Sequence, residues 1–193
     1  MINNICIFLE NEQRGFLTSL GIIFNSKYHA NVTYVIKDSS LHKIIVQDSN
    51  KDKKIIDYSK LRSSTLNNKN IINEALRIEK TYNVNLNSLI SENRGLGQGY
   101  LFNVQNVPEI EKSRFDYIYK YNEIINEIKN NEDIINGYDL VIQFYPNKLK
   151  TMVARKRGIK ILSIAPIRYG DNHIWSNDDY LNNTIIINSI KKN

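Results

Sequence analysis

The chain has 193 residues, 41% of them hydrophobic and 24% charged, and its formal net charge at pH 7 is +6. No apolar run reaches the roughly 20 residues that a membrane-spanning helix needs, so the composition is that of a globular protein. The first apolar run has no basic residues before it and acidic residues after it, which indicates a strand and not a signal peptide. The positive charge permits nucleic acid, an anionic membrane or a phosphorylated substrate as partner.

Segments of strand length alternate with segments of helical period along the first part of the chain. A buried strand is predicted over 5–9, a second strand over 32–36 and a helix over 40–46. Between the two strands a helix is predicted whose core-facing residues are Phe16, Leu20, Ile23 and Phe24. The segment 49–69 is polar and irregular, and helices are predicted over 71–82 and 109–130.

The last third gives the clearest pattern. A strand over 140–144 is stopped by Pro146, a helix from Lys148 ends at Gly158, and a strand over 159–165 is stopped by Pro166. This is a βαβ unit, so its strands should be parallel. The C-terminal "NNTIIINSIKKN" predicts a final strand or a short helix.

Continuous apolar strands without alternation indicate a sheet covered on both faces. We therefore predict a single α/β domain over 1–193. Its mostly parallel sheet would be doubly wound and Rossmann-like, with helices on both faces.

The densest group of cations lies between Lys148 and Lys160. Arg155, Lys156 and Arg157 fall in the last turn of the predicted helix, where cations complement the helix dipole. Helix stabilisation and anion binding both explain this group.

The residues with metal-binding or nucleophilic chemistry form no motif. His29, His42 and His173 lack ligand spacing, and no serine or cysteine triad pattern occurs, so neither a metal nor a cofactor is predicted. The single cysteine, Cys6, lies inside the first predicted strand and is expected to pack in the core. We expect a cytoplasmic protein.

Ligands of an open parallel sheet bind beyond the carboxyl ends of its strands. The loop after the first strand holds Glu10, Glu12 and Arg14. Because acids near a helix N-terminus are favoured by the dipole, capping and function both explain them. A dinucleotide fingerprint is absent from this loop.

The stretch "SENRGLGQGY" places Gly95, Gly97 and Gly99 between Arg94 and Tyr100. It follows no predicted strand, and its glycine spacing fits neither a dinucleotide fingerprint nor a P-loop. The stretch is either a mobile loop that lets the backbone approach a ligand or a plain flexible connection.

The stretch "PIRYGDNHIWSNDD" follows the last core strand and holds Arg168, Asp171, Asn172, His173 and Trp175. The arginine can pair with a phosphate or carboxylate, Asp171 or His173 can act as a general base, and the tryptophan can stack on a sugar or a base. Alternatively, the segment is a turn and Trp175 packs against the sheet.

The opening strand, the turn with Glu10 and Arg14, and the following helix resemble the start of the N-terminal domain of GT-B glycosyltransferases. The similarity is to those of bacterial capsule and surface polysaccharide synthesis. The stretches "GYDLVIQF" and "RGIKILSIAPIRYGD" are similar to a later part of the same domain. The resemblance implies an acceptor-binding domain of an enzyme that transfers a sugar from a nucleotide-sugar donor to a glycan or lipid-linked acceptor.

The resemblance also implies roles for the candidate residues. The donor would be bound by a missing C-terminal domain or a partner chain, so this chain alone is not expected to be active. An inverting transfer needs a base, for which the candidates are Asp171, His173 and Glu10, in that order. Arg94 and Arg168 would hold anionic groups. The glycine stretch would close over the acceptor. The remaining substrate-binding candidates are Arg14, Tyr100, Asn172 and Trp175.

A non-catalytic module that binds a nucleotide, a sugar or a protein partner is the alternative, with the same edge from Arg168 to Trp175 as its binding surface. Nucleic acid is disfavoured because most aromatic residues occupy core positions and acidic residues are interspersed. A lipid-linked acceptor would bring the chain to the inner face of the cytoplasmic membrane, whose anionic lipids match its charge.

Overall fold

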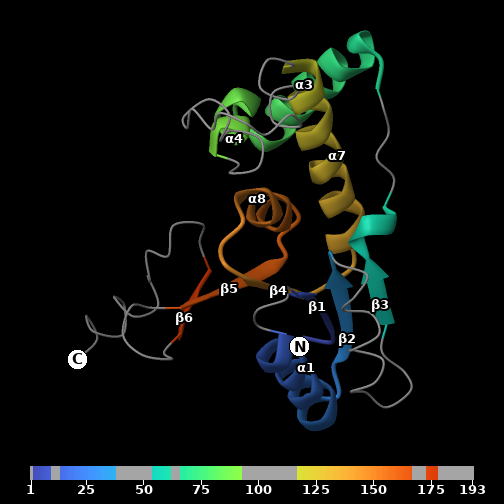
Figure 1. Ribbon diagram of the computed structural model, residues 1–193. Helices are drawn as coiled ribbons and strands as arrows, with labels where there is room; N and C mark the ends of the chain where they lie inside the picture. Colours follow the sequence, from blue (N-terminus) through green and yellow to red (C-terminus); the bar gives the residue numbers. More distant parts are fainter. Residues whose placement is uncertain are drawn as a thin grey trace, which may run out of the picture. The chain divides into compact units, whose positions relative to one another are not determined.

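A computed structural model describes residues 2–9, 14–37, 54–61, 66–92, 117–166 and 173–177 (Figure 1). The chain divides into two compact units, one formed by Met1–Leu61 with Ile135–Asn193 and the other by Arg62–Ile134. The first unit is called the sheet unit below and the second the helical unit. The predicted helix over 40–46, the glycine stretch and the C-terminal segment lie outside the described residues.

The sheet unit contains one six-stranded sheet with the order β3-β2-β1-β4-β5-β6. The strands are β1 (Asn4–Leu9), β2 (Asn31–Ile36), β3 (Lys54–Asp57), β4 (Leu140–Phe144), β5 (Lys160–Pro166) and β6 (His173–Ser176). All neighbouring strands pair in parallel except β5 and β6, which are antiparallel. The α/β class, the mostly parallel sheet and the parallel pairing of β4 with β5 are therefore confirmed.

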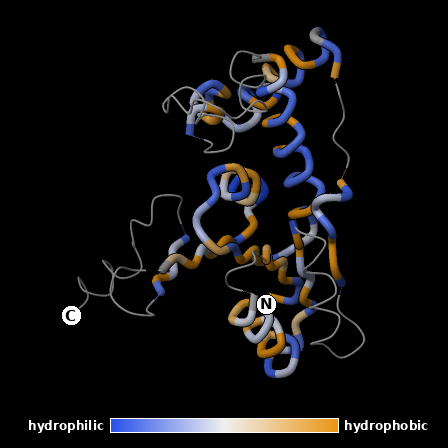
Figure 2. Tube along the Cα trace, in the orientation of Figure 1, coloured by the Kyte–Doolittle hydropathy of each residue, from blue (hydrophilic) through white to orange (hydrophobic). Residues whose placement is uncertain are grey.

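Helix α1 (Arg14–Tyr28) covers one set of strand side chains. Ile5, Ile7 and Leu9 of β1 share a hydrophobic core with Leu17 of this helix. Tyr34 of β2 is fully buried in the same core, and its hydroxyl donates to the carbonyl oxygen of Thr18 at 3.2 Å. The central strands that form this core are mostly hydrophobic along their length (Figure 2).

The predicted inner face of this helix was partly wrong. Phe16 and Ile23 are 44% and 49% exposed, whereas Leu17 is fully buried. Gly21 is also buried, one turn after Leu17, and the ring of Tyr34 lies against it. Leu20 and Phe24 pack against the core as predicted. The part of the inner face that was missed is Leu17 and Gly21, and glycine carries no hydrophobic signal.

Helix α8 (Lys148–Lys156) contacts the alternate set of strand side chains. The Nζ atom of Lys150 lies 4.2 Å from the centre of the Phe8 ring. Gln143 Nε2 donates to Thr151 Oγ1 at 3.3 Å. The helix ends before Gly158, which has a φ of +68°, as predicted. Two of the three predicted cations, Arg155 and Lys156, lie in its last turn, and Arg157 is the C-cap.

Two short strands were not predicted. β3 and a 3₁₀ turn (Tyr58–Lys60) lie in the segment read as irregular, and β6 lies in the segment read as a loop. Both occupy edges of the sheet, and most of their side chains are half-buried. Edge strands need no continuous apolar run, which explains why the pattern missed them.

The helical unit contains α3 (Asn68–Tyr82), α4 (Leu86–Glu92) and most of α7 (Tyr117–Ile135). Polar contacts join α3 to α7: Tyr82 Oη donates to Glu132 Oε1 at 2.6 Å, and Lys129 Nζ lies 3.4 Å from Glu74 Oε2. The hydrogen bond from Arg77 is the main cause that lowers the pKa of Glu74. In the described ranges no helix is long and apolar enough to cross a membrane.

Candidate functional site

The carboxyl ends of the parallel strands meet at one edge of the sheet, which we call the carboxyl edge. β1 and β4 are neighbours there although they are far apart in the sequence, and the chain leaves them in opposite directions across the sheet. This reversal is the topological switch point at which open α/β sheets bind ligands. Helices α1 and α8 both begin at this edge, after β1 and β4.

Five aromatic side chains gather near this edge, and we call them the aromatic cluster. Its members are Phe16, Phe144, Tyr145, His173 and Trp175. The rings of Phe16 and His173 are stacked, with centroids 6.0 Å apart and planes inclined by 5°. The ring centroid of Phe144 also lies 6.0 Å from that of His173, and the ring centroids of Trp175 and Phe16 are 6.3 Å apart.

Strand β6 determines where His173 and Trp175 lie. His173 pairs with Pro166 and Trp175 with Ile164, so both side chains lie on the same face of the strand. Trp175 packs against the core that includes Ile164. This tryptophan thus packs against the sheet, as the structural alternative predicts, and its contact with Phe16 links it to the edge.

The aromatic cluster has a buried base and an exposed rim. Phe144 is 2% exposed, whereas Phe16 and Tyr145 are 44% and 45% exposed. Tyr145 has a φ of +59°, a left-handed conformation that costs a non-glycine residue about 1–3 kcal/mol. Its amide donates to the carbonyl oxygen of Ile164 at 2.7 Å, which helps to hold that conformation. The exposed rings can stack on the apolar face of a sugar, and the imidazole can accept a proton.

The start of α8 adds a buried polar network beside β4. Asn147 caps the helix, with its Oδ1 accepting from the amide of Lys150 at 3.0 Å. Gln143 Nε2 donates to Ser163 Oγ at 2.8 Å, while Gln143 Oε1 is buried without a hydrogen-bond partner in the described part of the chain. These bonds fix the turn from β4 into α8.

Cys6 is not a nucleophile in this arrangement. It is fully buried in β1, and burial raises the pKa of its thiol to about 12, although the positive charge of Lys150 acts in the opposite direction. A thiol with such a pKa remains protonated at neutral pH. Over the residues that the structure covers, no group of three or more His, Cys, Asp or Glu side chains could hold a metal ion.

Among the predicted site residues, the structure brings His173 and Trp175 together and places both next to Phe16. The backbone of Arg14 begins α1 at the same edge. The other candidates lie outside the described residues: Glu10, Arg94, Gly95, Gly97, Gly99, Tyr100, Arg168, Asp171 and Asn172.

Three members of the aromatic cluster were not predicted as site residues, namely Phe16, Phe144 and Tyr145. Phe16 was assigned to the core face of its helix, and Phe144 was taken only as a strand residue. The proline in "FYP" signals where β4 stops, but it gives no sign of the left-handed Tyr145, because the residue before a proline is expected to be extended.

No family model, curated protein or solved structure matches the chain.

Proposed function

We propose that the sheet unit is a doubly wound, Rossmann-like domain that binds the acceptor of a GT-B glycosyltransferase at its carboxyl edge. The acceptor would be a glycan or a lipid-linked sugar of surface polysaccharide synthesis. A second domain or a partner chain would bind the nucleotide-sugar donor. The lone buried cysteine suits a cytoplasmic location, where such donors would be met.

The strand order supports the fold part of this proposal. Five parallel strands in the order β3-β2-β1-β4-β5 follow the Rossmann arrangement. α1 packs with Ile7 and Tyr34, whereas α8 contacts Phe8 and Gln143, which belong to the alternate set of strand positions. Since alternate side chains point to opposite faces, these contacts support helices on both faces.

The aromatic cluster is the single observation that supports an acceptor site at the carboxyl edge. Sugar rings present apolar C–H faces, which pack on aromatic rings, and hydroxyl groups, which need polar partners. Phe16 offers an exposed ring, and the imidazole of His173 lies parallel to it at 6.0 Å. An acceptor hydroxyl held over Phe16 would lie beside a side chain that can take its proton.

Thermal unfolding of the chain with two ligand panels tests the proposal. Alkyl glycosides and oligosaccharides stand in for acceptors, and nucleoside diphosphates and nucleotide sugars stand in for donors. A ligand at 100 times its dissociation constant stabilises the folded state by about 2.7 kcal/mol. We expect stabilisation by a member of the saccharide panel only. Stabilisation by a nucleotide would instead assign a nucleotide site to this chain and contradict the acceptor role.

A further inference from the structure

Tyr145 has a backbone conformation that its own side chain and its neighbour in the sequence both disfavour. Its φ of +59° lies in the left-handed region, where a bulky residue is an outlier. Pro146 follows it, and the residue before a proline is expected to be extended. Glycine would make the same turn from β4 into α8 without this strain. The backbone therefore gives no reason for a tyrosine at this position.

The other non-glycine residues with a positive φ in the described part of the chain have a structural explanation. Asn83 is the C-cap of α3, and His29 directly follows α1. A left-handed residue commonly ends a helix, and asparagine and histidine tolerate this conformation better than most residues. Tyr145 follows a strand and belongs to neither type. Strained residues of this kind cluster at binding and active sites.

Tyr145 lies where a ligand of this fold is expected. β4 ends at Phe144, so Tyr145 is at the carboxyl edge, beside the switch point between β1 and β4. The rings of Tyr145 and Phe144 are nearly perpendicular, with centroids 4.6 Å apart and planes inclined by 75°. The Tyr145 side chain nevertheless stays 45% exposed. The strained turn thus presents an aromatic ring to solvent at the ligand-binding edge.

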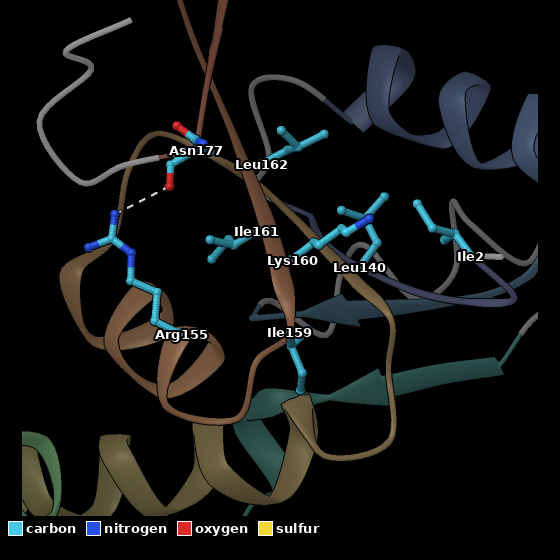
Figure 3. A pocket seen from close by; sticks show the side chains of 8 residues that line it. All are labelled: Ile2, Leu140, Arg155, Ile159, Lys160, Ile161, Leu162 and Asn177. Atoms are coloured by element: carbon cyan, nitrogen blue, oxygen red, sulfur yellow. Dashed lines mark hydrogen bonds between the residues drawn. The ribbon is translucent and has the colours of Figure 1, made fainter. Parts of the chain in front are cut away.

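The hollow at the other edge of the sheet, where β4 and β5 begin, divides into two surfaces (Figure 3). Its volume is about 490 Å³, but its lining comes from both faces of β5. Arg155 belongs to α8 on one face, whereas Leu162 packs with the core on the other. The strand lies between these side chains (Figure 3). One small ligand cannot contact both surfaces, which leaves the carboxyl edge as the stronger candidate.

The ring contacts place Tyr145 and Phe16 at different ends of the aromatic cluster. Phe16 stacks on His173, and the ring centroid of Phe144 lies 6.0 Å from that of His173. Tyr145 contacts Phe144 in turn. A half-buried and a buried ring therefore connect two exposed rings. A single sugar unit needs only one exposed ring, whereas a longer saccharide presents an apolar face to each.

We infer that Tyr145 is a second stacking residue of the carboxyl edge, whose ligand is a saccharide of at least two sugar units. One unit lies on Phe16 and the next on Tyr145. This role rests on the proposed acceptor site and extends its ligand from one sugar unit to two. The left-handed turn is retained because it holds the second ring at the edge, although glycine would make a more stable turn.

Isothermal titration calorimetry with matched methyl glycosides tests this role. Methyl glucoside is compared with methyl maltoside and methyl cellobioside, and methyl galactoside with methyl lactoside, so that each pair differs by one sugar unit. The best disaccharide should bind about tenfold more tightly than its monosaccharide, because it alone reaches Tyr145. Tyr145→Gly and Tyr145→Ala should both remove this difference and leave monosaccharide binding unchanged.

Two further variants serve as controls. Tyr28 is 60% exposed at the far end of α1, where it contacts Phe24, so Tyr28→Ala should leave the binding of both ligands unchanged. Tyr145→Phe retains the ring and should retain the preference for the disaccharide. A loss of that preference in Tyr28→Ala would overturn the assignment to Tyr145.

Urea unfolding of the two variants without the ring measures the strain separately. Only Tyr145→Ala keeps a side chain in the left-handed region, so Tyr145→Gly should unfold at a higher urea concentration. The role of Tyr145 is overturned if the two midpoints are equal or if Tyr145→Gly still prefers the disaccharide. It is also overturned if the wild type shows no such preference while Phe16→Ala weakens monosaccharide binding, a result that leaves the acceptor site standing. No binding of any of these glycosides would contradict the proposed function as well.

Discussion

Replacement of Gly21 by alanine tests how α1 packs on the sheet. A Cβ atom at this position would lie 2.8 Å from Cζ and 3.1 Å from Cε1 of Tyr34, and closer still to its hydroxyl oxygen. Tyr34 is fully buried, so its ring cannot move away without displacing core side chains. Burial also raises the pKa of Tyr34 to about 12, so its hydroxyl stays protonated and donates to Thr18 at neutral pH.

The magnitude follows from three contributions. Overpacking a core costs about 1–3 kcal/mol, and this close approach favours the upper end. Loss of the Tyr34 hydrogen bond destabilises the folded state by about 1 kcal/mol more. The better helix propensity of alanine stabilises it by about 1 kcal/mol. We expect a net loss of about 2–3 kcal/mol in the free energy of unfolding. The melting temperature should fall by roughly 4–12 °C in a chain of this length.

Urea unfolding followed by circular dichroism measures this loss, and Gly15→Ala is the matched control. Gly15 lies in the same helix, and a Cβ atom there would meet nothing within 4 Å, so the control should be neutral or more stable. In the Gly21→Ala background, Tyr34→Phe removes the atom of closest approach and should cost less than in the wild type. Equal stability of the two alanine variants would refute the packing of Gly21 against Tyr34.

Three further results are expected from the sheet unit. Asn147→Ala removes the N-cap of α8 and should lower the free energy of unfolding by about 1 kcal/mol in urea, whereas Asn147→Ser should retain most of it; equal losses would contradict the cap. Hydrogen bonds from the amides of Asn4 and Asn3 lower the pKa of Asp139 below its usual 3.8. Wild-type stability should therefore fall as the pH drops through that lowered pKa, and Asp139→Asn should lack this part of the pH dependence in acid unfolding curves. Cys6 should resist a thiol reagent at pH 8 in the folded chain and react once guanidinium unfolds it; rapid reaction of the folded chain would contradict its burial.

The central strands could be predicted from the sequence because their signal is local. β1, β4 and β5 are mostly apolar, with Gln143 and Ser163 as buried polar exceptions. Pro146, Gly158 and Pro166 mark where elements stop. The parallel pairing of β4 and β5 then follows from the helix between them. β3 and β6 were not predicted because these short edge strands contain polar and half-buried residues.

The candidate site could be predicted only in part, because it depends on contacts between distant segments. His173 and Trp175 were identified as polar and aromatic residues after a core strand. Their contact with Phe16 depends on the antiparallel turn of β6 and on the rotation of α1. That rotation is set by Gly21 and Tyr34, which no helical period reveals.

The saccharide site proposed on the aromatic cluster of the carboxyl edge can be tested directly. Trp175 is the only tryptophan of the chain, and its ring centroid lies 6.3 Å from that of Phe16. Its fluorescence therefore reports directly on this site. The decisive measurement is a fluorescence titration with the saccharide that gives the largest thermal stabilisation. It would be repeated with Phe16→Ala and with Ile22→Ala, an equally exposed residue of the same helix.

We predict a saturable change in Trp175 emission whose dissociation constant rises about tenfold in Phe16→Ala and stays unchanged in Ile22→Ala. Saturable binding that leaves the emission unchanged, or that Phe16→Ala does not weaken, would contradict a saccharide site on the aromatic cluster.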